Sequence, residues 1–240
     1  MERKHYINTD SHSPIAQRCR RLFGEQLKQA QQHFDELEKN NIVRRSKSPW
    51  ASPLVLVKKS DGSLRPCSDY RQVNEVTVPD RYPLPRMEDI LFKVGNGKIF
   101  SKLDLRKAYH QIRMNEVDIP KTAIITPFGL FEYVYTPFGL KCASQTFQRT
   151  VDQILKPFEH CCAAYIDDII IFSETREQHY KDVANVLEQI TSSGLVLNES
   201  KSIFIQDSIN FLGFNISRRG VKPTKSKQLR TSNCHRKPRN

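Results

Sequence analysis

The chain has 240 residues, of which 38% are hydrophobic and 27% charged, and its 38 Lys and Arg against 26 Asp and Glu give a formal net charge of +12. This composition is typical of a folded chain and excludes wholesale disorder, while the lack of any run of about 18 apolar residues excludes a membrane span. The first residues lack the apolar stretch of a signal peptide, and six scattered cysteines show neither a Cys-x-x-Cys pair nor histidines at zinc-ligand spacing. The sequence therefore predicts a soluble intracellular protein with reduced thiols.

The positive charge is concentrated near the C-terminus. Residues 218–240 contain nine Lys and Arg and no Asp or Glu, which leaves 29 basic and 26 acidic residues in the other 217. A net charge of +3 over that larger part is too small to indicate a polyanionic partner. The function must therefore be sought in motifs.

The first part of the chain predicts four segments. Residues 1–25 read as an extended lead-in without periodicity. Apolar residues three or four apart predict an amphipathic helix over 27–37, which ends at the following Asn-Asn pair. The segment 53–71 predicts a two-stranded ribbon that turns at its Asp-Gly step. The prolines within 79–85 exclude regular helix or central strand, so a subdomain boundary is predicted there.

The second part alternates strands with helices. Apolar residues at helical spacing predict helices over 147–158 and 180–190. Between them, the run CCAAYIDDIIIFS predicts a hairpin with two buried arms and an acidic turn. Other strands are predicted over 99–105, on both sides of 127–129, over 202–205 and over 210–216.

Three aspartates stand among apolar positions. Asp167 and Asp168 lie between the two hydrophobic arms, and Asp104 ends the segment IFSKLD. An ionised carboxylate is costly to bury without a compensating cation, and hard divalent cations prefer oxygen ligands. The pattern indicates a two-metal site for nucleotidyl transfer, with Asp104 and Asp167 as principal ligands because neighbouring strand residues point to opposite faces. An ordinary surface turn is the alternative interpretation of the Asp-Asp pair.

Four motifs occur in a recognisable order: LDLRKAYHQI from Leu103, YTPFGLKCASQTFQ from Tyr135, YIDD from Tyr165 and INFLGF from Ile209. Their sequence and intervals resemble those of reverse transcriptases. The segment SPWASPLVLVKKSDGSLRPCSDYRQVN from Ser48 is similar to the gypsy-type long-terminal-repeat retrotransposons in particular, so that the chain resembles a fragment of their Pol polyprotein over roughly residues 14 to 223.

The resemblance implies an α+β fold, the right-hand polymerase with fingers and palm, in which the palm is an antiparallel sheet backed by helices and the thumb is largely absent. The implied organisation is a lead-in over 1–25, one part of the fingers over 26–85, the palm with the remaining fingers and the primer-grip hairpin over 86–217, and a basic, disordered tail over 218–240.

The implied activity is that of an RNA-directed DNA polymerase, which transfers deoxynucleotides to a primer 3′-hydroxyl by a two-metal mechanism with two Mg²⁺ ions, for which Mn²⁺ can substitute. The catalytic carboxylates would be Asp104, Asp167 and Asp168, and the metal ligands these three and the backbone carbonyl of Leu105. The implied nucleotide-binding residues are Lys59, Arg65, Lys107, Ala108, Tyr109, Phe138, Gly139 and Lys201, and the implied primer grip is Leu212 and Gly213. Tyr109 would be the steric gate that excludes a 2′-hydroxyl. Because Lys58 stands beside Lys59, the choice of Lys59 as the triphosphate-binding lysine is left open.

Departures from the family pattern keep alternatives open. Cys142 and Ser144 stand where the family has Asn and Pro, and fewer residues follow Gly213 than the thumb, connection and ribonuclease H regions need. The alternative is a truncated, inactive retroelement relic that binds nucleic acid; a ribonucleotide polymerase is a third class, against which Tyr109 argues. The implied partners are an RNA or DNA template with its primer and deoxynucleoside triphosphates, with no membrane. The implied location is a cytoplasmic retroelement particle, with the nucleus as the alternative.

Overall fold

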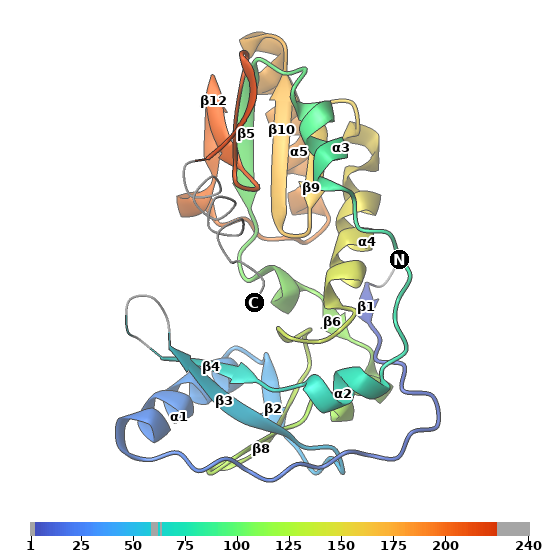
Figure 1. Cartoon of the computed structure of the whole chain (residues 1–240), viewed down its shortest axis with the longest axis vertical. Helices are drawn as coiled ribbons and strands as arrows, with labels where there is room; N and C mark the ends of the chain where they lie inside the picture. Colours follow the sequence, from blue (N-terminus) through green and yellow to red (C-terminus); the bar gives the residue numbers. More distant parts are fainter. Residues whose placement is uncertain (1–2, 59–61, 63, 225–240) are drawn as a thin grey trace, which may run out of the picture. The chain divides into compact units, whose positions relative to one another are not determined.

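The structure is a computed structural model that describes residues 3–58, 62 and 64–224 (Figure 1). The chain divides into two compact units: unit 1 comprises Met1–Tyr82 and Lys107–Phe147, and unit 2 comprises Pro83–Arg106 and Gln148–Asn240. The first division falls inside the proline-spaced segment 79–85, where proline removes the N–H that a helix or central strand requires. None of the helices among the described residues has the length and apolar character needed to cross a membrane.

Unit 1 is built on a mixed sheet with strand order β2-β8-β7-β3-β4, in which the β3–β7 pair is parallel and the other pairs are antiparallel. A separate parallel pair joins β1 to β6. Its strands are β1 (Lys4–His5), β2 (Val43–Arg45), β3 (Ser52–Lys58), β4 (Leu64–Ser68), β6 (Arg113–Met114), β7 (Ile124–Thr126) and β8 (Gly129–Tyr133). Its helices are α1 (Gly24–Lys39) and α2 (Arg71–Val76), with the 3₁₀ segments η1 (Ala108–Gln111) and η2 (Glu116–Thr122).

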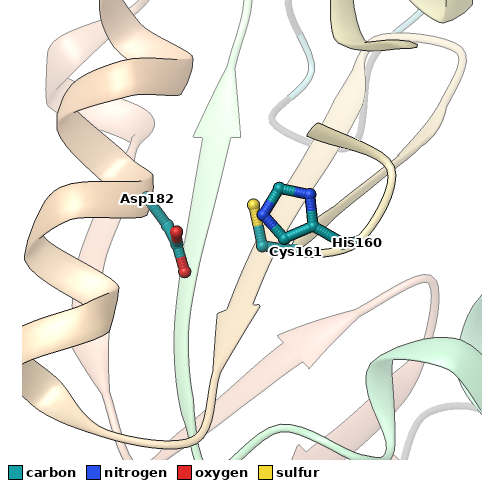
Figure 2. Close-up of side chains that lie close together, drawn as sticks. All are labelled: His160, Cys161 and Asp182. Atoms are coloured by element: carbon teal, nitrogen blue, oxygen red, sulfur yellow. The ribbon is translucent and has the colours of Figure 1, made fainter. Parts of the chain in front are cut away.

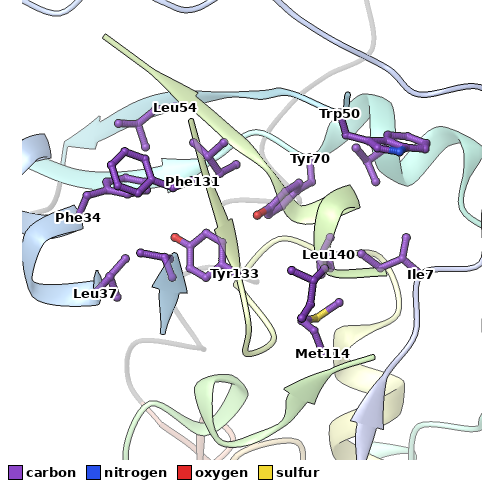
Figure 3. Close-up of a cluster of buried hydrophobic side chains, with 14 of the residues drawn as sticks. Ile7, Phe34, Leu37, Trp50, Leu54, Tyr70, Met114, Phe131, Tyr133 and Leu140 are labelled. Carbon is purple, nitrogen blue, oxygen red and sulfur yellow. The ribbon is translucent and has the colours of Figure 1, made fainter. Parts of the chain in front are cut away.

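The predicted packing helix is confirmed as α1, which buries Ala30, Phe34 and Leu37 along one stripe. Figure 3 shows Phe34 and Leu37 in the core of the unit, where the Phe34 ring contacts the ring of Phe131 in β8. The helix ends at the predicted place because Asn40 is its C-cap and Asn41 adopts a φ of 54°, a left-handed conformation that asparagine tolerates. The predicted ribbon is confirmed as the β3–β4 pair.

Unit 2 is built on an antiparallel sheet with strand order β11-β5-β10-β9, accompanied by a three-stranded antiparallel sheet, β12-β13-β14. Its strands are β5 (Ile99–Asp104), β9 (Cys162–Tyr165), β10 (Asp168–Ser173), β11 (Ile203–Gln206), β12 (Ser208–Phe211), β13 (Phe214–Ser217) and β14 (Gly220–Pro223). Its helices are α3 (Met87–Val94) and α5 (Arg176–Ser192), with the 3₁₀ segments η3 (Lys156–Phe158) and η4 (Glu199–Lys201). The helix α4 (Ala143–Leu155) begins in unit 1 and continues into unit 2.

The two faces of the four-stranded sheet are buried against different elements. Phe100, Ile170 and Phe172 share a hydrophobic cluster with residues of α3 and of β12–β14. On the opposite face, the hydroxyls of Ser101 and Ser173 hydrogen-bond the ring of His179 in α5, at 2.7 and 2.8 Å. An antiparallel sheet backed by helices, the expected palm, is therefore confirmed.

Three details of the unit differ from the prediction. The strand expected over 210–216 is two strands, β12 and β13, because a two-residue turn divides it. Tyr180, placed on the buried stripe of its helix, is 57% exposed, and α5 instead buries His179 and Asp182 beside Val183. Gly220–Pro223, expected to be part of the disordered tail, instead pairs with β13 as strand β14. The remainder of that tail, 225–240, lies outside the described residues.

Candidate active site

The strand register brings two of the predicted carboxylates together. Asp104 at the end of β5 is the direct cross-strand partner of Asp168, the first residue of β10. The carbonyl of Asp104 accepts a hydrogen bond from the Asn198 N–H at 2.8 Å, so its backbone polar groups face away from β10. Asp104 and Asp168 are therefore a non-hydrogen-bonded pair, the kind whose Cα atoms lie about 4.5 Å apart with their side chains on one face.

Asp167 occupies the turn between β9 and β10, and its charge is perturbed. Tyr165 pairs with Asp168, so the turn consists of Ile166 and Asp167, and Asp168 already belongs to the strand. Burial raises the pKa of the Asp167 carboxyl, and the nearby carboxylates of Asp168 and Asp104 raise it further. A group of negative charges that disfavour one another, with oxygen as the donor atom, fits a hard divalent cation.

The turn itself has an uncommon backbone. Ile166 adopts a φ of 57°, which is a genuine outlier for a β-branched residue and costs about 1–3 kcal/mol. The buried side chain of Gln148 holds this turn: its Oε1 accepts the Ile166 N–H at 2.6 Å, and its Nε2 donates to the Ala164 carbonyl at 3.1 Å and to Asp152 at 2.8 Å. Because β9 is an edge strand, Gln148 supplies the partners that a further strand would provide.

Other groups fix the end of β5. Ser202 Oγ accepts the Asp104 N–H at 3.2 Å, and Leu105 forms an isolated bridge with Leu197. The Arg106 N–H completes that bridge by donating to the Val196 carbonyl at 3.0 Å. Since strand carbonyls alternate in direction, the predicted Leu105 carbonyl points toward the β10 edge, on the side of the carboxylates.

Lys102 balances part of the negative charge. Its Nζ lies 2.6 Å from Asp168 Oδ1, and both side chains are partly buried. The same ammonium lies 5.9 Å from the centre of the Phe211 ring at the end of β12. The carboxylates and the β12–β13 hairpin therefore share one face of the sheet.

The predicted primer-grip residues form the turn of that hairpin. Leu212 and Gly213 have φ angles of 49° and 80°, the two positive values of a type I′ turn, between the paired residues Phe211 and Phe214. The Gly213 carbonyl accepts hydrogen bonds from the N–H and hydroxyl of Thr224, both at 3.0 Å. Lys201 is exposed at the end of η4, next to Ser202.

The remaining predicted residues lie in unit 1. The Tyr109 ring makes edge contacts with Phe138 and Phe147, with ring centres 5.1 and 5.6 Å apart, and its hydroxyl hydrogen-bonds the hydroxyl of Ser144 at 3.0 Å. The Arg65 guanidinium lies 5.2 Å from the centre of the Phe138 ring. The structure thus brings Tyr109, Phe138 and Arg65 together. Lys59 lies outside the described residues.

The backbone around these residues has two special conformations. Lys107 has a φ of 47° at the start of η1, followed by the buried Ala108. Gly139 has a φ of 95°, and its carbonyl accepts a hydrogen bond from the Asn74 amide at 2.8 Å. Glycine is favoured there because a side chain would be strained at that φ.

The electrostatic field in this part of unit 1 is positive. Burial, together with the charges of Lys107, His33 and Arg65, lowers the pKa of His110 to about 4. The pKa of His33 is also lowered, by burial and by Lys107 and Arg65 against the opposing effect of Glu36. A cluster that disfavours a further positive charge is suited to an anion.

Four residues with evident roles at these sites were missed by sequence reasoning: Lys102, Ser144, Gln148 and Ile166. Lys102 precedes Asp104 by two positions, and residues two apart on a strand lie on the same face. The position of its ammonium group near the carboxylates could therefore have been predicted. Ser144 was noted only as a departure from the family pattern, and the structure gives it the Tyr109 hydroxyl as a partner. Gln148 and Ile166 had no signal, because a hydrogen bond between separate elements depends on tertiary packing.

Known proteins resemble the chain in sequence and in structure. The family described as reverse transcriptase (RNA-dependent DNA polymerase) matches residues 57–216. The Pol polyprotein of transposon 297 from Drosophila melanogaster is 40% identical over 227 residues, which cover 92% of this chain and 21% of that protein. The Tf2-3 polyprotein of Schizosaccharomyces pombe is 39% identical over 186 residues, which cover 77% of this chain and 14% of that protein. The chain thus spans about a fifth of the length of the first of these relatives.

Solved structures of the foamy viral protease-reverse transcriptase share the fold. The one in complex with an RNA/DNA hybrid has a TM-score of 0.87 at 24% identity and covers 98% of this chain and 32% of that one. The one in complex with double-stranded DNA has a TM-score of 0.86 at 25% identity and covers 96% and 48% of the two chains. With the family match over two thirds of its length, the chain belongs to the reverse transcriptase family and has its fingers and palm fold.

Proposed function

We propose that this chain is the polymerase core of a gypsy-type retrotransposon reverse transcriptase, which adds deoxynucleotides to a primer 3′-hydroxyl along an RNA or DNA template. One observation carries the proposal: Asp104, Asp167 and Asp168 converge at the end of β5 and the β9–β10 turn, on the sheet face that also bears the β12–β13 hairpin. The match to retrotransposon Pol proteins supports the reaction class.

Divalent metal ions are general to this family, and here Mg²⁺ is the proposed cofactor, with Mn²⁺ as a substitute. Asp104, Asp167 and Asp168 would hold two ions, with the Leu105 carbonyl as a further oxygen ligand. When bound, the ions would stabilise the charge on the attacking and leaving oxygens of the phosphoryl displacement. Lys102 would orient the Asp168 carboxylate through their 2.6 Å contact.

The unit 1 residues would bind the incoming nucleotide. The Tyr109 ring, held by Ser144, Phe138 and Phe147, presents a rigid surface that excludes a sugar with a 2′-hydroxyl. Arg65 and Lys59 would neutralise the triphosphate, and the N–H groups of Lys107 and Ala108 would donate hydrogen bonds to it. Phe138 and Gly139 would back the nucleotide, and Lys201 would lie near the departing pyrophosphate.

The solved structures of relatives support a nucleic-acid substrate for this chain. The foamy viral enzyme binds an RNA/DNA hybrid and double-stranded DNA in its solved complexes, which supports a primed template as the partner of this chain. Leu212 and Gly213, in a turn fixed by Thr224, would aim the primer 3′-hydroxyl. A retroelement polymerase of this type would work in a cytoplasmic particle.

Primer extension tests the proposal. The purified chain is given a 5′-labelled primer on RNA and on DNA templates, with deoxynucleotides and Mg²⁺ or Mn²⁺. Extension is expected, and Asp167→Asn should reduce it to background because it removes a ligand charge. Asp207→Asn is the matched control, since Asp207 is exposed and pairs only with Arg176 among the described residues; it should extend like the wild type.

Two outcomes would count against the proposal. If the wild-type chain binds primed template in a salt-sensitive way but extends no primer with either ion, the relic interpretation is favoured. If Asp167→Asn extends as well as the wild type, the carboxylates are not the catalytic centre.

A further inference from the structure

A second group of potential metal ligands lies in unit 2, apart from the three aspartates assigned to catalysis. His160 and Cys161 immediately precede β9, and Asp182 comes from α5 (Figure 2). One ligand atom from each of the three side chains lies within 4.8 Å of the others. A nitrogen, a sulfur and a carboxylate oxygen therefore converge from two separate elements.

The site is partly enclosed and has an open side. Cys161 is 3% and Asp182 5% exposed, while His160 is exposed. The three line a pocket of about 290 Å³, whose other walls include Asn96 and Glu174. Two buried ligands with one exposed ligand at the rim form an arrangement that an ion could enter from the solvent side.

The surroundings already orient the ligand groups. Asp182 accepts hydrogen bonds from the Ser173 hydroxyl at 2.7 Å and from the Gln178 amide at 2.8 Å, one on each oxygen. Ser173 is also hydrogen-bonded to His179. The backbone of Cys161 is fixed by its N–H to the Phe158 carbonyl at 3.0 Å and by its own carbonyl, which accepts the Phe172 N–H at 2.9 Å. Such supporting hydrogen bonds are the usual outer partners of metal ligands.

The donor atoms select the class of metal. Magnesium and calcium take oxygen ligands, whereas thiolate and imidazole together favour zinc and related transition ions. Tetrahedral zinc needs bonds of about 2.0–2.3 Å, so the three ligand atoms, which lie within 4.8 Å of one another, would draw closer together on binding. Binding through the Cys161 sulfur requires the thiolate, so the thiol proton passes to solvent when the ion binds.

We propose that His160, Cys161 and Asp182 form a zinc-binding site, with three protein ligands and a fourth position open to the pocket. The ion would join α5 to the segment that leads into β9, the strand that ends in the Ile166–Asp167 turn. Sequence spacing did not predict the site, because Asp182 lies 21 residues beyond Cys161 on another element.

Metal titration of the full-length chain tests the site. Chelator-stripped protein is titrated with Co²⁺, whose thiolate-to-metal charge-transfer band reports sulfur ligation, and bound zinc is measured by competition with a chromogenic chelator. We expect one equivalent to bind with a thiolate band. Cys161→Ser should abolish the band, and His160→Ala should weaken affinity by about tenfold or more.

Control variants separate this site from other candidates. Cys234→Ser removes the thiol of the Cys-His pair in the tail, and Asp167→Asn alters the proposed catalytic carboxylates; both should bind Co²⁺ with the wild-type band. Because His160 is exposed, its variant leaves the fold intact, and urea unfolding checks Cys161→Ser. A band that survives Cys161→Ser, affinity unchanged in His160→Ala, or no binding at micromolar Co²⁺ would overturn the proposal, whether or not the chain extends primers.

Discussion

Gln148→Met is the substitution that best tests how the catalytic turn is held. Methionine is close to glutamine in length and flexibility, so the buried volume is nearly conserved. The change removes the acceptor of the Ile166 N–H and the donor to the Ala164 carbonyl. Since β9 is the edge strand, neither group has a neighbouring strand on that side to replace Gln148.

The expected loss can be worked out from these contacts. Each polar group left without a partner in this partly buried place costs about 1–3 kcal/mol, so two groups predict a decrease of about 2–6 kcal/mol in the free energy of unfolding. With a urea m-value of about 2–3 kcal/mol/M, the unfolding midpoint should fall by about 1–3 M. The positive φ of Ile166, no longer supported, should relax and displace Asp167, so the rate of nucleotide addition should fall as well.

Urea unfolding and single-nucleotide incorporation measure the two effects. Gln145→Met is the matched control: Gln145 lies three residues earlier, and its buried Oε1 has no hydrogen-bond partner among the described residues. That variant should be as stable as the wild type or slightly more so. If Gln148→Met changes the free energy of unfolding by less than about 0.5 kcal/mol, as a neutral substitution does, the role of Gln148 as a clamp is refuted.

Three further predictions follow from single contacts. Tyr109→Val should admit ribonucleotides in competition assays, and unchanged sugar discrimination would remove Tyr109 as the gate. Ser144→Ala removes one hydrogen bond to the Tyr109 hydroxyl, worth about 1 kcal/mol, so discrimination should fall by about fivefold; a loss as large as that of Tyr109→Val would contradict this estimate. Burial lowers the pKa of His5 from 6.5 to about 4, so its contribution of about 3 kcal/mol is present above pH 6.5 and is lost as the pH falls toward 4. His5→Asn should reduce the pH dependence of unfolding in that range, and an unchanged slope would refute this assignment.

Much of the candidate site was predictable because local sequence determines it. The apolar arms around Asp167 and Asp168 predict a hairpin, and the strand that ends at Asp104 follows from its own pattern. The pairing of the two strands, which places Asp104 opposite Asp168, did not follow from the local sequence. A shift of one residue in the β5–β10 register would move Asp104 to the other face, and no local signal fixes that register.

The buried face of helix α5 was harder to predict than the position of the helix. An apolar stripe through Tyr180 was the natural choice, yet the helix buries His179 and Asp182, two polar residues. They are buried because Ser101 and Ser173 on the facing strands satisfy their hydrogen bonds. A polar network between elements reverses the rule that apolar residues mark the buried face, and only the packed structure reveals it.

Two turns in unit 2 hold a large aliphatic residue in a backbone conformation that such residues disfavour; one contains the proposed metal ligand Asp167, and the other is formed by the proposed primer-grip residues. Each begins with a large aliphatic residue at positive φ, Ile166 at 57° and Leu212 at 49°, where glycine or asparagine is favoured. Leu212 packs against the hydrophobic cluster, and Gly213 after it provides the second positive φ. Ile166 instead depends on one hydrogen bond from a distant helix. Local preference is overridden at both turns, which is expected where precise placement of a neighbouring group, the carboxylate or the primer end, matters more than stability. The Ile166 turn has the fewer supports, so the placement of Asp167 should be the more sensitive of the two to mutations in the surrounding helices.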